Sequence, residues 1–114
     1  MSEISQALAI KAMDALAMRQ TAIAHNIANA GSEVFQRREV SFEDALREAA
    51  EDGPEAVRSL VFNMETDGPR ISGDDVRLDL EMQSASSTAG RYAALADLLG
   101  RQMQIARAAV RGGQ

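Results

Sequence analysis

The chain has 114 residues, of which 46% are hydrophobic, and its formal net charge is −5 at pH 7. A chain of this length forms one small domain at most, and its acidic balance argues against nucleic acid as the main partner, because phosphate binding needs a basic surface. The absence of cysteine excludes disulfides and thiolate metal sites. With only three phenylalanines, one tyrosine and no tryptophan, we expect closely packed helices rather than a thick core.

The charge is distributed unevenly along the chain. Residues 33–81 carry fourteen acids and six bases, whereas residues 82–114 carry one acid and four arginines. No apolar run approaches the ~18 residues of a membrane span. The first residues, MSEISQALAIKAMDALAMRQ, lack the basic start and apolar block of a cleaved signal peptide, so export would need a route without one.

A long helix is predicted over residues 3–29. The segment has no Gly or Pro and is rich in good helix formers. Residues spaced alternately by four and three lie on one seam, as in a coiled coil: Ala9, Met13, Leu16, Gln20, Ile23 and Ile27. At about 40 Å, this helix is too long for the rest of so small a chain to cover, so it needs partners.

The middle of the chain, residues 30–76, lacks a long apolar pattern. Gly31 ends the first helix, and VFQRREVSF indicates extended chain. Ser41 followed by Asp44 resembles a capping box that starts a short helix near residues 42–51. Residues 57–64 fit either a strand or a helix, with extended chain favoured, and TDGPRISGDD is typical of a loop.

A second long helix is predicted over residues 77–111. Ten apolar or aromatic positions alternate spacings of four and three: Leu78, Met82, Ala85, Ala89, Tyr92, Ala96, Leu99, Met103, Ala106 and Val110. A second stripe, Leu95, Leu98, Gln102 and Ile105, lies beside it. This wide apolar band predicts packing against several helices. The predicted fold is mainly α, with the two terminal helices paired as an antiparallel, coiled-coil-like hairpin and a partly extended, loop-rich middle.

No pattern in the sequence indicates an active site, a cofactor or a metal. His25 is the only histidine, and Asp14, about three turns away on the same helix, is too far to act as its partner. The acids near residue 40 lack ligand spacing and a supporting histidine. We therefore expect a protein that is not an enzyme, in which His25 faces solvent or caps the helix end.

The two helical segments resemble the bacterial flagellar axial proteins. RQTAIAHNIANA followed by SFEDAL is similar to the N-terminal signature of that family, in which Asn-Ile-Ala-Asn closes a long helix. The segment VRLDLEMQSASSTAGRYAALADLLGRQMQIARAAV is similar to its C-terminal helix, most closely that of the basal-body proximal rod proteins of the FlgB type. One departure is GSEVFQ, which stands where the family usually has a Thr-Pro-Gly-Tyr-like turn.

The resemblance implies a structural rod subunit that polymerises through its terminal helices and is exported by the flagellar type III apparatus. Its partners would be other copies, other rod proteins, the basal-body ring and the export apparatus. The subunit itself would lie in the basal body, in the periplasmic rod. The predicted interface residues are Met13, Leu16, Ile23, Asn26, Ile27, Asn29, Tyr92, Leu95, Leu98, Leu99, Met103 and Val110. Asn26 and Asn29 are expected to be structural. The alternative is a soluble helical adaptor or chaperone-like protein that binds a partner helix in a groove.

Overall fold

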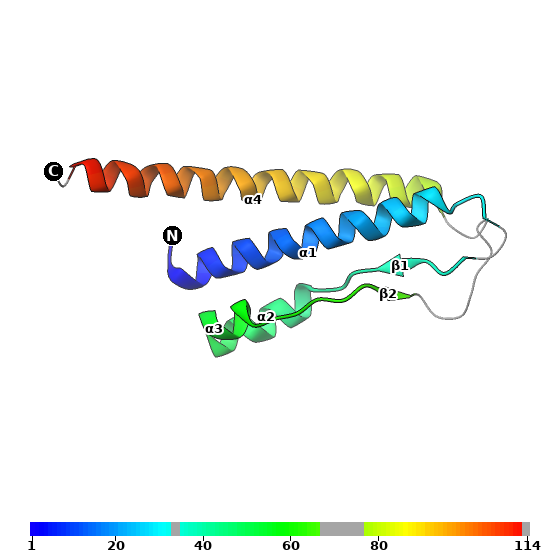
Figure 1. The fold of residues 1–114 in the computed structure, drawn as a ribbon, viewed down its shortest axis with the longest axis horizontal. Coiled ribbons are helices and arrows are strands. Elements are labelled where there is room, and N and C mark those ends of the chain that lie inside the picture. The colour runs from blue at the N-terminus through cyan, green and yellow to red at the C-terminus, as the bar shows by residue number, and fades with distance from the viewer. Residues whose placement is uncertain (33–34, 67–76, 113–114) are drawn as a thin grey trace.

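The computed structural model describes residues 1–32, 35–66 and 77–112, and it is elongated, with principal extents of 64 × 27 × 14 Å (Figure 1). In chain order the elements are α1 (Glu3–Ala28), β1 (Arg38–Glu39), α2 (Glu43–Asp52), α3 (Pro54–Arg58), β2 (Glu65–Thr66) and α4 (Leu78–Gly112). The mainly helical fold predicted from the sequence is confirmed. The loop predicted over TDGPRISGDD lies outside the described residues except for its first residue.

The helices α1 and α4 form the predicted antiparallel hairpin. Three hydrogen bonds fix their register: the Asn26 side chain contacts Glu81, Gln20 Nε2 donates to the carbonyl of Ala85 at 3.0 Å, and the Met1 amino group donates to Gln102 at 2.9 Å. The start of α1 therefore lies level with Gln102 of α4. The last ten residues of α4 extend beyond the start of α1, as Figure 1 shows.

The helix α1 occupies the centre of the molecule. It packs against α4 on one side and against α2, α3 and β1 on the other (Figure 1). The strands β1 and β2 form a two-stranded antiparallel sheet, with Arg38 opposite Thr66. Since α1 is buried from two sides while α4 packs mainly on α1, the two long helices differ in how much of their apolar surface is covered.

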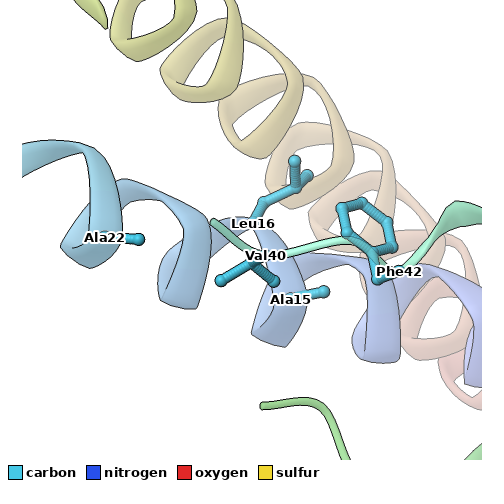
Figure 2. Close-up of a cluster of buried hydrophobic side chains, with 5 residues drawn as sticks. All are labelled: Ala15, Leu16, Ala22, Val40 and Phe42. Atoms are coloured by element: carbon cyan, nitrogen blue, oxygen red, sulfur yellow. The ribbon is translucent and has the colours of Figure 1, made fainter. Parts of the chain in front are cut away.

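A buried cluster joins α1 to the chain that follows β1. Ala15, Leu16 and Ala22 of α1 contact Val40 and Phe42, and all five are 5% exposed or less (Figure 2). Alanine's small side chain lets an extended segment lie directly on the helix surface. Leu16 belongs to the predicted seam, but Ala15 and Ala22 lie beside that seam, so the spacing by four and three did not predict this second buried face of α1.

A smaller cluster holds the two short helices against the first turns of α1. It consists of Ala7, Ala49 and Val57, of which Val57 is completely buried. Val57 belongs to α3, so the extended chain favoured for residues 57–64 is wrong for the first two of those residues. Pro54 at the first helical position is preorganised for a new helix, and burial of Val57 stabilises that helix.

The predicted capping box at Ser41 is also wrong. Phe42 is the N-cap of α2, and no side chain caps that helix. The helix begins one residue too late for Ser41 to reach its first amides. The Glu43 carboxylate lies instead within 3.3 Å of the Phe42 amide, which donates to it, and two bonds from Arg19 hold the same carboxylate.

We predict that Gly53→Ala destabilises the protein by about 1–3 kcal/mol, because Gly53 has φ 107° and ψ 179°, a conformation almost restricted to glycine. An added Cβ there would meet nothing within 4 Å, so the cost comes from the backbone alone. Gly100→Ala is the matched control: it lies within α4, also in open space, and should stabilise by about 1 kcal/mol. Urea unfolding of both variants measures the difference, and equal stabilities would contradict the assignment.

Candidate assembly surface

The asparagine side chain of Asn26 connects α1 to β1. Asn26 is fully buried, its Nδ2 donates to the carbonyl of Arg38 at 2.8 Å, and its Oδ1 accepts from the amide of Arg38 at 2.8 Å. This pair of bonds imitates the contacts that a neighbouring strand would make. The sequence predicted a structural asparagine at a helix end, and the structure places it within the last turns of α1, where it holds the returning chain.

A buried carboxylate completes this corner. Glu81 of α4 is 3% exposed, and its Oε1 accepts from Arg37 Nε at 2.5 Å and lies 3.4 Å from Asn26 Nδ2. The corner therefore joins the end of α1, the segment before β1 and the start of α4. A buried charge is tolerated where a partner of opposite charge and further hydrogen bonds accompany it. We call Asn26, Arg37, Arg38 and Glu81 the corner cluster.

Asn29 and His25 have a simpler role. Asn29 is the C-cap of α1, and its Nδ2 donates to the carbonyl of His25 at 2.8 Å, a carbonyl that also accepts the backbone amide of Asn29 at 3.2 Å. The His25 ring lies 5.3 Å from the ring of Phe35, so the side chain packs against an aromatic neighbour. This packing differs from the expected solvent-facing or capping position.

A second polar cluster surrounds Arg19, whose importance the sequence did not indicate. Its Nη2 donates to the carbonyl of Val40 at 2.8 Å and to Glu43 at 2.7 Å, and its guanidinium lies 4.5 Å from the centre of the Phe42 ring. Arg91 of α4 also approaches Glu43, at 3.7 Å. Arg19 thus fixes the chain between β1 and α2 on the surface of α1. An isolated arginine in a helical segment does not by itself predict such contacts.

We predict that Glu43 gives a pH-dependent stabilisation. Hydrogen bonds from Arg19 lower the pKa of Glu43 from its ordinary value of 4.5 to about 2. A lowered pKa stabilises the fold above the ordinary value, and that stabilisation is lost as the pH falls from 4.5 toward 2. The side chain is 47% exposed, so solvent screening reduces the effect to about 1 kcal/mol.

Urea unfolding of the protein and of Glu43→Gln, at pH values from about 6 down to about 2, tests this expectation. The variant should be less stable at the upper end, and the difference should shrink as the pH falls. A difference that stays constant with pH would show that Glu43 acts through packing rather than through its charge.

The face of α4 that contacts α1 is not the face with the most regular apolar spacing. Glu81 and Thr88 are the buried residues of α4, and Leu95 packs against the α1 cluster. Among the predicted stripe residues, the large side chains are exposed at five positions: Leu78, Met82, Tyr92, Met103 and Val110. The intramolecular face thus contains polar residues, which apolar periodicity does not predict. The apolar stripe remains largely exposed to solvent.

The predicted interface residues therefore fall into two sets. Those of α1 lie against the rest of the subunit or in its corner: Met13, Leu16, Ile23, Asn26, Ile27 and Asn29 are buried or half-buried. Among those of α4, Leu95 and Leu99 are half-buried, and Tyr92, Leu98, Met103 and Val110 are exposed. The exposed large side chains of the predicted stripe form a band along most of α4, which we call the open face: Leu78, Met82, Tyr92, Met103 and Val110.

Two apolar grooves flank the contact between the long helices. One, of about 510 Å³, is lined by Leu16, Ala17, Gln20, Thr21 and Ala24 of α1 and by Thr88, Ala89 and Tyr92 of α4. The other, of about 820 Å³, lies between the first half of α1, the helix α2 and the later part of α4. Each groove offers mostly apolar side chains from two or more helices, as a surface for a further helix would.

In residues 1–32, 35–66 and 77–112, no three or more His, Cys, Asp or Glu side chains are grouped so as to hold a metal ion. None of the described helices is long and apolar enough to cross a membrane.

The fold and its open face define an elongated helical-hairpin protein with more apolar surface than one chain covers. In comparisons with known proteins, no family model matches the chain, and no curated protein matches it significantly.

Proposed function

We propose that the chain is a structural subunit of the bacterial flagellar rod, of the proximal rod type, which polymerises through its terminal helices. It has no catalytic role in this proposal. Its partners are further copies, other rod proteins, the basal-body ring and the export apparatus, and it reaches the periplasm by the flagellar type III route without a cleaved signal.

One observation carries the proposal beyond the sequence resemblance: the open face of α4. Met82, Met103 and Val110 are 59%, 58% and 67% exposed, although monomeric proteins rarely leave extended apolar surface in water. This band runs along most of a 35-residue helix, so its coverage requires contact along the length of the molecule. Side-by-side packing of elongated subunits in a tube supplies such contact.

The alternative is a helical adaptor that binds one partner helix. The observation in its favour is the larger groove, whose apolar lining and three helical walls suit a single helix. The two functions differ in how assembly ends. A rod subunit forms head-to-tail contacts that extend without closure, whereas an adaptor forms a closed complex of fixed size.

Fractionation of cells that produce the protein tests the rod proposal. The chain should copurify with intact basal bodies and remain with them when soluble proteins are washed away. Recovery only in a small soluble complex with one other protein would favour the adaptor and remove the rod assignment.

A further inference from the structure

The methionine side chains differ in their exposure to solvent. Met82 and Met103 lie on the open face and are 59% and 58% exposed. Met1, which lies outside α4, is 43% exposed. The other three are half-buried: Met13, Met18 and Met64. Of these, Met18 and Met64 pack against the buried cluster that joins α1 to the chain after β1. An oxidant dissolved in water therefore reaches the thioethers of the open face more readily than those of the interior.

The two methionines of the open face stand among smaller side chains. Alanine occupies three of the stripe positions between them: Ala85, Ala89 and Ala96. Met82 and Met103 thus supply much of the apolar surface in this part of α4. A long, flexible thioether fits the irregular surface of a packing partner well. A chemical change at these two sulfur atoms would therefore alter the character of the open face.

The chemistry available to an exposed thioether is oxygen transfer from a peroxide. The sulfur atom forms a bond to one oxygen of hydrogen peroxide while the O–O bond breaks, and water is released. The sulfur loses two electrons and the peroxide gains them. The product, methionine sulfoxide, has a polar side chain in place of an apolar one, and methionine sulfoxide reductases reverse the change.

We propose that oxidation of Met82 and Met103 by a peroxide controls whether the open face can pack. This rests on the proposed function, in which subunits pack along that face. In the free chain each sulfoxide oxygen stays hydrated, so the fold is retained. In a packed apolar contact the same oxygen lacks a hydrogen-bond donor, and each sulfoxide should weaken the contact about tenfold or more.

Assembly protects the same two sulfur atoms, because a packed open face excludes the oxidant. The modification therefore acts on free subunits and stops new assembly, while assembled subunits keep reduced methionines. A sulfoxide reductase returns the free subunits to the form that packs.

Peptide mass spectrometry of the dilute, purified chain during exposure to hydrogen peroxide tests the accessibility of each sulfur atom. Met82 and Met103 should gain oxygen several-fold faster than Met18 and Met64. The helix content of the chain oxidised at Met82 and Met103, measured by circular dichroism, should equal that of the unmodified chain. Equal oxidation rates at all four positions, or loss of helix content, would overturn the inference.

Sedimentation velocity of the concentrated chain tests the effect on packing. Self-association should be lost after exposure to peroxide and restored by a sulfoxide reductase. The double variant Met82→Leu, Met103→Leu keeps an apolar face that forms no sulfoxide, so its association should survive the same treatment. The matched control Met18→Leu, Met64→Leu keeps both methionines of the open face and should remain sensitive.

Three outcomes of the sedimentation experiment contradict this inference: a chain that is monomeric before oxidation, association that survives sulfoxide formation at Met82 and Met103, and equal sensitivity of the two leucine variants. Fractionation of basal bodies is a separate test. A chain whose association is blocked by oxidation but which never copurifies with basal bodies retains the sensitive face and loses the rod assignment. A chain that copurifies with basal bodies but associates when oxidised retains the rod assignment and loses this inference.

Discussion

Replacement of Asn26 by alanine should lower the free energy of unfolding by about 3 kcal/mol, because partly buried backbone groups lose their partners and each such loss costs about 1–3 kcal/mol. Asn26 is completely buried and bonds both the amide and the carbonyl of Arg38. Asn26 also contacts the buried carboxylate of Glu81. In the variant, Arg37 would be the one corner-cluster side chain that still contacts this carboxylate. Urea unfolding of the purified variant gives the value.

Asn29→Ala is the control for this change. Asn29 lies three residues further along and its side chain bonds one carbonyl of the helix end, that of His25. Its loss should cost about 1 kcal/mol, the usual net value of one hydrogen bond, because the His25 carbonyl keeps its bond from the Asn29 amide. If both variants lost the same free energy of unfolding, the bonds of Asn26 would stabilise the fold no more than the single bond of Asn29 does. His25→Ala should lower the free energy of unfolding by still less than Asn29→Ala does.

On the proposed rod function, replacement of Met82 by glutamate should leave the chain folded and prevent its incorporation into the rod. Met82 is 59% exposed in the single chain, so a carboxylate there remains in water. In an assembly that covers the open face, the same carboxylate would be buried at a cost of several kcal/mol per subunit unless a cation pairs with it. Electron microscopy of basal bodies from the mutant strain should show no rod beyond the ring.

Ala94→Glu is the matched control, since Ala94 is exposed on α4, outside the apolar stripe, and lines neither of the two grooves described above. It adds the same charge to the same helix, and rods should form. Circular dichroism of both purified proteins should show the helix content of the unmodified chain. Complete rods in the Met82→Glu strain would contradict the use of the open face in assembly.

The sequence by itself determined the two long helices and their antiparallel pairing. Good helix formers without Gly or Pro define α1, and Gly53 followed by Pro54 ends α2. These are local signals, in which each residue favours one backbone conformation regardless of its distant neighbours. The apolar spacing of α4 likewise predicted its helix.

The tertiary structure alone decided which face of α4 meets α1. Glu81 and Thr88 are buried there, although their polar side chains argue against burial in a sequence. Glu81 is tolerated because Arg37, 44 residues away, supplies its counter-charge. Arg19 similarly acquires its role from Val40 and Glu43. Contacts between residues far apart in the chain are set by packing. The spacing of residues within one helix therefore does not predict them.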